Sequence, residues 1–275
     1  MTHSVDSSPL GQKTAYISAY YASLLFPIPR AESRKSLGLS ESLPFFGCDI
    51  WTGYELSWLN QKGKPEVAVA EFSIPFNSPF IIESKSFKLY LNSFNQTKFS
   101  CLDEVKALLV ADLSAIAGAP IGVDLYRLAN SNLLIDFMFD AICIDDLDVV
   151  IDTYHPQPEL LAIDSSVSVT EKLCSHLLKS NCPVTGQPDW ASLFIEYSGA
   201  KIRHENLLRY VVSFREHQDF HEHCVERVFV DIASQCKPES LSVYARYTRR
   251  GGLDINPFRS SEPSAKPKVG RLLRQ

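Results

Sequence analysis

The segment Tyr90-Leu-Asn-Ser-Phe recurs later in the chain as Tyr210-Val-Val-Ser-Phe. An aspartate follows each copy at nearly the same distance: Asp112 lies 18 residues after the end of the first copy, and Asp231 lies 17 residues after the end of the second. Order, spacing and residue identities agree together, which favours an internal duplication over a coincidence between two amphipathic helices. A repeated unit of strands and two helices predicts an α+β fold.

Helices and strands are predicted around both copies of the repeat. Apolar residues recur at helical spacing over 84–94 and from Cys101 to a stop at Gly118 in the first half, and over 205–216 and 221–234 in the second. Runs of β-branched and aromatic residues predict strands on either side of these helices. The predicted strands cover 53–58, 66–75, 121–128, 132–139, 166–172, 191–202 and 241–247.

The length of the chain, 275 residues, favours two domains. The acidic stretch 145–152 is followed by Pro156 and Pro158, and it is the predicted linker. We therefore expect an N-terminal domain over 1–150 and a C-terminal domain over 151–275.

Two other segments are predicted to lack regular structure. Residues 10–44 contain Pro27, Pro29 and Pro44, which favour a loop. The tail 260–275 is rich in Ser, Pro and Lys, and its composition predicts disorder with no assigned role.

Composition bounds the class of protein. The chain is 45% hydrophobic and 21% charged, which is typical of an ordinary globular protein, and its formal net charge is -5. Proteins that bind bulk nucleic acid are more often basic, so we expect a free small molecule as the partner, with no nucleic acid and no membrane. The seven cysteines are an odd number in a chain without a secretory signal, which predicts free thiols in the cytoplasm.

The segment Cys182-Pro-Val-Thr-Gly-Gln-Pro-Asp189 is the first candidate site. Its two prolines and its glycine exclude a regular helix and predict a rigid loop. A free thiol is the best nucleophile for chemistry at neutral pH, and Asp189 can exchange a proton at the same centre. The spacing alone favours the alternative of a buried structural cysteine with a turn-capping aspartate. Cys143, Cys174 and Cys236 lie in apolar stretches and are expected in the core.

A second candidate site lies at the start of the predicted helix 84–94. Glu83 and Ser84 stand where unpaired backbone N–H groups welcome anions or polar ligands. Lys85 and Lys88 follow one turn apart and can meet a phosphate. The alternative is an exposed lysine pair on a capped helix, and this segment alone favours it.

Histidines and arginines mark two further segments. His217, His221 and His223 lie close together, but no second ligand motif accompanies them, so we expect no metal here. The pair His221-Glu222 at a helix start better suits a heterocycle, because its carboxylate accepts ring N–H and amino protons. The stretch Arg249-Arg-Gly-Gly can grip phosphate, although an exposed basic turn is the alternative. There is no Gly-x-Gly-x-x-Gly, so a Rossmann cofactor domain is unsupported.

Taken together, these segments resemble one family. Glu83-Ser-Lys-Ser-Phe-Lys-Leu-Tyr90 fits the signature of the 7-cyano-7-deazaguanine reductases of the queuosine pathway of tRNA modification at every position. The Cys182–Asp189 loop, Phe220-His-Glu and Arg249-Arg-Gly-Gly are also similar to that family. The resemblance spans essentially the whole chain, in the long, duplicated form.

The resemblance implies two tandem tunnelling-fold units, each an antiparallel sheet backed by two helices. It implies Cys182 and Asp189 as the catalytic pair, and a homodimer as the assembly. It also implies the residues that bind the substrate, which are Ile82, Glu83, Ser84, His221 and Glu222. The residues that it implies for NADPH binding are Ser84, Lys85, Arg250 and Gly251.

The implied reaction is coherent on physical grounds. Reduction of a nitrile to an amine takes two hydrides, and a free nitrile accepts hydride poorly. Addition of the Cys182 thiolate gives a thioimide that accepts hydride from NADPH far better, with Asp189 as the proton donor. Two other classes stay open: a hydrolase that acts on a pterin, a purine or a nitrile, and a binding or scaffold module with an inert Cys182. Consumption of NADPH separates the reductase from the hydrolase, and slow, unselective alkylation of Cys182 would favour the binding module.

Overall fold

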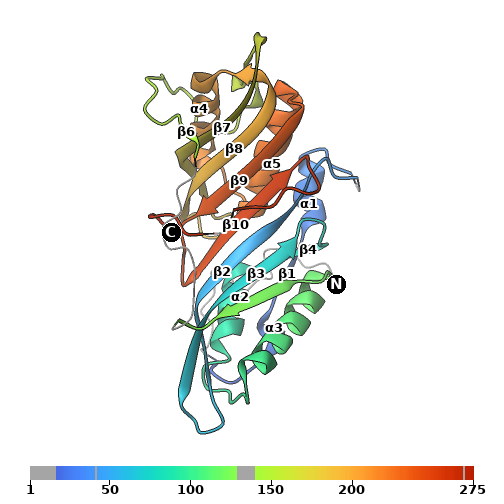
Figure 1. The fold of residues 1–275 in the computed structure, drawn as a ribbon, viewed down its shortest axis with the longest axis vertical. Helices are drawn as coiled ribbons and strands as arrows, with labels where there is room; N and C mark the ends of the chain where they lie inside the picture. The colour runs from blue at the N-terminus through green and yellow to red at the C-terminus, as the bar shows by residue number, and fades with distance from the viewer. Residues whose placement is uncertain (1–16, 41, 129–139, 269) are drawn as a thin grey trace. The chain divides into compact units, whose positions relative to one another are not determined.

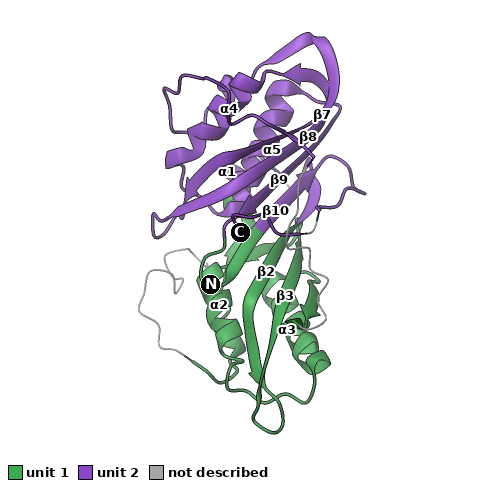
Figure 2. Cartoon of the chain, turned by 60° about the vertical axis from the view of Figure 1, so that its left-hand side comes forward, with its two compact units in different colours: residues 1–33, 49–133, 249–255 green, residues 34–48, 134–248, 256–275 purple. Residues whose placement is uncertain are grey.

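The computed structural model describes residues 17–40, 42–128, 140–268 and 270–275. The chain divides into two compact units (Figure 2), which we call unit 1 and unit 2. Unit 1 comprises residues 1–33, 49–133 and 249–255, and unit 2 comprises 34–48, 134–248 and 256–275. The units are therefore not continuous in sequence. The division into domains 1–150 and 151–275 stays a prediction, and the predicted strand 132–139 lies outside the described residues.

Unit 1 holds a sheet with strand order β5-β3-β2 and the first residues of β10, together with two helices (Figure 1). Strands β3 and β5 pair antiparallel. The elements are β2 (Phe46–Leu59, of which residues 49–59 belong to unit 1), β3 (Pro65–Pro75), β5 (Gly122–Tyr126), α2 (Ser84–Asn92), α3 (Leu102–Ala117), the 3₁₀ helix η2 (Ala22–Leu24) and the short antiparallel pair β1 (Pro27–Pro29) and β4 (Phe80–Ile82).

The core of unit 1 lies between its helices and its sheet. Phe87 of α2 packs against Trp51 of β2 and Phe72 of β3, with ring centroids 5.3 and 4.9 Å apart. Helix α2 begins at Ser84, as predicted, and α3 ends at Ala117, directly before the predicted stop at Gly118. Gly118 has a φ of 69°, which is the left-handed conformation that favours glycine after a helix.

Unit 2 holds the strand order β10-β9-β8-β7-β6, of which β6 and β7 pair parallel while β7, β8, β9 and β10 pair antiparallel. Helix α5 packs against β9. The elements are β6 (Ile142–Cys143), β7 (Ile163–Asn181), β8 (Pro188–Ile202), β9 (Ser240–Tyr247), β10 (Leu253–Ser260), α4 (His204–Ser213), α5 (His221–Cys236) and the 3₁₀ helices η4 (Pro158–Leu160) and η5 (Phe214–Glu216).

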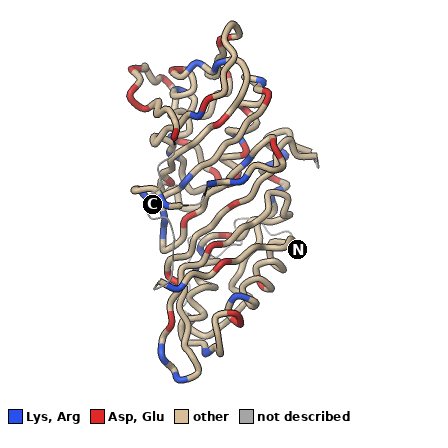
Figure 3. The backbone as a smooth tube through the Cα atoms, viewed as in Figure 1, with Lys and Arg blue, Asp and Glu red and all other residues tan. Residues whose placement is uncertain are grey.

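The fold is therefore α+β, with a large antiparallel sheet, as predicted. The tandem tunnelling-fold arrangement stays a prediction. Figure 3 shows basic and acidic residues interspersed in both units. Among the described residues, no helix combines the length and the apolar character that crossing a bilayer requires.

The repeated segments make the same contacts in both units. The hydroxyl of Tyr90 donates to Asp112 over 2.7 Å, and the hydroxyl of Tyr210 donates to Asp231 over 2.6 Å. The serine that follows each tyrosine by three residues donates to the tyrosine carbonyl oxygen over 2.6 Å in both copies. The sequence repeat thus corresponds to a structural repeat of two helices joined by a buried tyrosine–aspartate hydrogen bond.

Strand β10 was absent from the sequence prediction. The sequence of β10 mixes Asp254, Pro257 and Arg259 with apolar residues, yet all eight residues of the strand are buried. The charges are matched by partners that only the fold supplies: the hydroxyl of Tyr54 donates to Asp254 over 2.6 Å, and Arg259 lies 2.8 Å from Glu226. Alternation of apolar and polar residues cannot reveal such a strand, because polar residues are buried on both of its faces.

The predictions for the two irregular segments were also wrong in part. Within 10–44, helix α1 (Arg30–Ser36) is highly charged and lacks an apolar stripe, but Arg30 and Arg34 are buried against Asp49 and Glu226 at 2.6 and 2.7 Å. Within 260–275, the described residues return to the sheet, where Gln275 donates to the carbonyl oxygen of Tyr247 over 3.0 Å.

Candidate active site

Cys182 lies in the tight loop that joins β7 to β8 in unit 2. Its backbone N–H donates to the carbonyl oxygen of Gln187 over 2.9 Å, and the N–H of Gly186 donates back to the Cys182 carbonyl oxygen over 3.0 Å. The thiol is free, and the residue is only 6% exposed. The predicted rigid loop is confirmed, and it presents one buried cysteine at the end of a strand hairpin.

Asp189 is held by the same hairpin. It stands in β8, directly across the antiparallel ladder from Ser180 of β7. Its carboxylate is buried, and its Oδ2 lies 3.3 Å from Nε2 of His221. The aspartate therefore lies on the strand just after the cysteine loop, with an imidazole as its partner.

His221 is the first residue of α5, and two sets of contacts fix it. Its ring stacks on Tyr247 of β9, with centroids 3.9 Å apart and planes 22° from parallel. The loop before α5 is joined to the end of β7, because the N–H of Asn181 donates to the carbonyl oxygen of His217 over 2.8 Å and the carbonyl oxygen of Asn181 accepts from the N–H of Asp219 over 3.2 Å. The start of α5 is thereby joined to the residue that precedes Cys182.

The other two histidines of this segment bind a different carboxylate. His223 Nδ1 lies 3.2 Å from Asp219, and His217 Nε2 lies 3.7 Å from it. Burial acts to raise the pKa of Asp219, but the contacts with His217 and His223 outweigh it and hold that pKa well below its usual range. These two histidines therefore hold the loop before α5 together, and His221, the third histidine of the segment, lies beside Asp189.

Glu222 follows His221 on α5 and is 2% exposed. One turn further, Glu226 is fully buried and binds Arg34 and Arg259 at 2.7 and 2.8 Å. The sequence analysis did not single out Glu226, since its two cationic partners come from segments distant in the chain. Glu226 thus fixes α5 in unit 2, and this positions the neighbouring turn with Glu222.

Glu83 caps α2 in unit 1. Its two carboxylate oxygens accept the N–H groups of Lys85 and Ser86 over 2.8 and 2.7 Å, and the residue is almost fully buried, like Ile82 before it. Burial raises the pKa of Glu83 above its ordinary value, although both hydrogen bonds act in the opposite direction. A carboxylate has about four lone-pair sites, so the cap leaves acceptor capacity for a ligand.

The arginine turn of unit 1 lies against α2. The N–H of Arg250 donates to the carbonyl oxygen of Leu253 over 2.9 Å, which closes the turn between β9 and β10. Gly251 has a φ of 61°, which strains any residue other than glycine, and a Cβ there would lie 2.8 Å from Nζ of Lys88, so that side chain would have to move. Lys88 also lies 3.4 Å from Glu55. The turn with Arg250 and Gly251 is thus packed beside the helix that begins with Ser84 and Lys85.

The structure therefore groups the predicted residues into two sets. Unit 1 holds Ile82, Glu83, Ser84, Lys85, Arg250 and Gly251, and unit 2 holds Cys182, Asp189, His221 and Glu222. Tyr247 was missed as a member of the second set, because its stacking on His221 depends on strand pairing that no local pattern reveals. The sequence gives one indication that Tyr247 belongs to the site: it ends a predicted strand and precedes the arginine pair by two residues.

Two family models match the chain. Residues 16–125 match "Nitrile reductase, 7-cyano-7-deazaguanine-reductase N-term", and residues 188–266 match "QueF-like protein". Together these ranges include all of the first set of site residues, and all of the second set except Cys182.

Curated relatives match over nearly the full length. A protein of Burkholderia multivorans named NADPH-dependent 7-cyano-7-deazaguanine reductase is 55% identical over 98% of this chain and 99% of its own length. A protein of Bordetella pertussis with the same name is 56% identical over 99% of this chain and 100% of its own length. A solved structure of an archaeosine synthase described as QueF-Like, in the apo form, covers 38% of this chain and 99% of that chain at 19% identity, with a TM-score of 0.31. On the match to these full-length relatives, the chain belongs to the nitrile reductase family of NADPH-dependent 7-cyano-7-deazaguanine reductases.

Proposed function

We propose that this chain reduces the nitrile of 7-cyano-7-deazaguanine to 7-aminomethyl-7-deazaguanine, with NADPH as the hydride donor and Cys182 as a covalent nucleophile. The full-length relatives carry the name of this activity. The observation that carries the proposal is the pairing of a free, buried thiol in a closed loop with the Asp189–His221 pair on the adjoining strand and helix. A thiol and a proton donor in such an arrangement suit addition to a nitrile.

Cys182 begins the reaction. Its sulfur adds to the nitrile carbon, and the nitrile nitrogen takes up a proton from Asp189, so that a C–S bond replaces one of the C–N π bonds. The product is a thioimide, whose carbon accepts hydride far more readily than that of a nitrile. The low exposure of Cys182 and Asp189 keeps water away from this intermediate.

Proton transfer is the task of the Asp189–His221 pair. After the first hydride has been added, the C–S bond breaks, the electron pair returns to the sulfur of Cys182, and an imine is left. The imine then receives a second hydride and a proton. His221, stacked on Tyr247 and 3.3 Å from Asp189, is placed to return protons to that carboxylate between the two steps.

Glu83 and Glu222 are proposed to hold the deazapurine. Both are buried carboxylates, and carboxylates accept the ring N–H and amino protons that a guanine-like base presents. Removal of either would leave the donors of the base without partners, which costs more than the loss of an exposed contact. Ile82, Ser84 and His221 are proposed to complete the binding of the substrate.

The residues of unit 1 fit a dinucleotide phosphate. NADPH supplies one hydride for each of the two reduction steps. Glu83 already accepts the backbone N–H groups of Lys85 and Ser86, so the positive charge that meets phosphate is assigned to the side chains of Lys85 and Arg250. The positive φ of Gly251 lets the arginine turn approach a ligand closely. We assign Ser84, Lys85, Arg250 and Gly251 to NADPH on this basis.

The same proposal covers the oligomeric state of the chain, its location in the cell and the pathway in which it acts. We infer that the repeated tyrosine–aspartate helices mark two tandem tunnelling-fold units and that the chain forms a homodimer in the cytoplasm. The product is a precursor in queuosine biosynthesis, and the net charge of -5 supports a free base rather than tRNA as the substrate.

An absorbance assay of NADPH oxidation tests the proposal. The purified chain with 7-cyano-7-deazaguanine should oxidise two NADPH for each nitrile consumed, and mass spectrometry should identify the aminomethyl product. Reactions without the nitrile, and with Cys182→Ala protein, are the controls. Formation of a formyl or carboxyl product without NADPH oxidation would make the chain a hydrolase, and no turnover together with slow, unselective alkylation of Cys182 would favour a binding module.

A further inference from the structure

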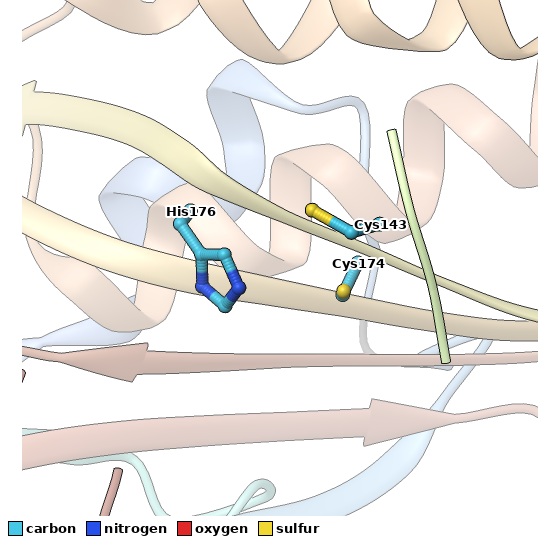
Figure 4. Close-up of side chains that lie close together, drawn as sticks. All are labelled: Cys143, Cys174 and His176. Atoms are coloured by element: carbon cyan, nitrogen blue, oxygen red, sulfur yellow. The ribbon is translucent and has the colours of Figure 1, made fainter. Parts of the chain in front are cut away.

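Three metal-ligating side chains of unit 2 gather at the edge of its sheet, in a segment to which the proposed reaction assigns no role. Cys143, Cys174 and His176 each place one ligand atom within 4.8 Å of the other two (Figure 4). Cys174 is buried, whereas the other two are exposed, so an ion from solvent can reach the group. Cys143 was expected in the core, and its exposure corrects that prediction.

The strand pairing explains this grouping. Cys143 of β6 is the register partner of Cys174 of β7 in a parallel pair. His176 follows Cys174 by two residues, and residues two apart in a strand project from the same face of the sheet. The three ligands therefore occupy adjacent positions of a single sheet surface, and the hydrogen-bonded backbone holds them there.

The geometry is close to that of a tetrahedral zinc site. Bonds of about 2.3 Å to sulfur and about 2.0 Å to nitrogen place the ligand atoms of tetrahedral zinc about 3.5–3.8 Å apart. The separations of up to 4.8 Å here differ from that by about 1 Å, which small side-chain rotations can close. Nδ1 of His176 lies 2.7 Å from the hydroxyl oxygen of Ser192, which leaves Nε2 as the nitrogen available to a metal. Such a second hydrogen bond is the usual way in which a metal-binding histidine is oriented.

A carboxylate beside the thiols provides an independent observation. Oδ2 of Asp145 accepts the backbone N–H of His176 over 2.9 Å, while its other oxygen, Oδ1, is buried and makes no hydrogen bond within the described part of the chain. A buried acceptor without a donor costs free energy unless it is matched, and a cation beside these groups would match it.

We propose that Cys143, Cys174 and His176 bind one Zn²⁺ ion, with water in the fourth position and Asp145 as a nearby negative charge. Binding exchanges the two thiol protons for the ion, so that two Zn–S bonds form and about two protons are released. The ion fastens the short strand β6 to β7. Thiolate and imidazole donors favour Zn²⁺ over Mg²⁺ or Ca²⁺.

Metal content of the full-length, reduced chain tests this proposal. After dialysis against a slight excess of Zn²⁺ and then a metal-free buffer, the protein should retain one equivalent, and Co²⁺ in its place should give the visible bands of a tetrahedral thiolate site. Cys174→Ser and His176→Ala should each weaken Zn²⁺ binding by about 100-fold or more, since even substitutions behind the ligands cost about 10- to 100-fold. Cys101→Ser, which removes an exposed thiol in unit 1, should leave binding unchanged.

Two results would overturn it: no metal retained by the reduced wild type, or retention unaffected by the two substitutions. Far-ultraviolet circular dichroism of each variant guards against misfolding, and Cys143→Ser, at an exposed position, gives a second ligand variant that should fold. The measurement needs neither nitrile nor NADPH, so it stands apart from the proposed reduction.

Discussion

Oδ2 of Asp189 lies 3.3 Å from Nε2 of His221, although the two residues belong to a strand and a helix separated by more than thirty positions in the chain. Two features keep them together. Strand pairing sets Asp189 opposite Ser180, and stacking on Tyr247 fixes the imidazole of His221. A carboxylate that is buried beside an imidazole, one loop away from a free thiol, is placed to move protons during covalent chemistry on that thiol.

Replacement of Asp189 by asparagine should separate catalysis from binding. Asp189→Asn keeps the size of the side chain but removes its capacity to give and take a proton. We expect kcat to fall by about 100- to 10,000-fold, because that is the usual contribution of a general acid or base. Binding of 7-cyano-7-deazaguanine, measured by calorimetry, should change little. Lost binding with surviving turnover would show that the role of Asp189 is structural.

His221→Phe tests the partner of that carboxylate. Phenylalanine retains the ring that stacks on Tyr247 but has no nitrogen to place 3.3 Å from Asp189. The variant should fold, lose about 10- to 100-fold in kcat, and lose one limb of the bell-shaped pH profile of kcat. His221→Gln, which retains a hydrogen-bonding group, should recover part of the rate. An unchanged pH profile in the phenylalanine variant would contradict proton transfer through His221.

The covalent step predicts an adduct in the absence of NADPH. Wild-type protein mixed with the nitrile should gain the mass of one ligand in intact mass spectrometry, because the thioimide cannot proceed without hydride. Cys182→Ser should show no such gain. Cys101→Ser, an exposed thiol in unit 1, should form the adduct as the wild type does. A wild type that turns over but is never modified would rule out the covalent route.

Asp219 predicts a pH-dependent contribution to stability. Its pKa is lowered in the folded protein from an ordinary value of 3.8, so its contribution is present above that value and is lost as the pH falls toward the lower folded pKa. Asp219→Asn should therefore reduce the free energy of unfolding at pH 7 by about 1–3 kcal/mol. The difference from the wild type should shrink below about pH 4.

Urea unfolding of both proteins between pH 7 and pH 3 measures this difference. Asp148→Asn, at an exposed position, is the control and should track the wild type throughout. A constant difference between wild type and Asp219→Asn over the whole pH range would contradict the role assigned to the histidine pair.

The two tyrosine–aspartate pairs predict unequal losses of stability. Asp112 accepts from Tyr20 as well as from Tyr90, each over 2.7 Å, so Tyr90→Phe leaves it one donor. For Asp231, in contrast, the described residues provide one tyrosine donor, Tyr210. Burial already raises the pKa of Asp231. Tyr210→Phe should therefore cost about 1–3 kcal/mol, and Tyr90→Phe about 1 kcal/mol or less. Equal losses of unfolding free energy in the two variants, measured by thermal or urea unfolding, would contradict this prediction.

Local chemistry in the sequence was sufficient for several parts of the fold. The repeated tyrosine segments predicted two helix pairs, and the helices end and begin where Gly118 and Glu83 indicated. The loop of Cys182 followed from its prolines and glycine, which exclude a helix whatever surrounds them. The family signature named both sets of candidate residues, each of which depends on segments of only a few residues.

The tertiary structure alone decided which side chains face one another. The buried charges of β10 and α1 are stable because Glu226, Tyr54 and Asp49, which lie in distant segments of the chain, contact them in the fold. No local sequence pattern predicts these contacts. The contact between Asp189 and His221 likewise depends on the position of α5 against the sheet. The contact between Cys143 and Cys174 depends on the register between β6 and β7. Register is set by long-range packing of whole strands, so the sequence determined which chemical groups exist and the fold determined which of them meet.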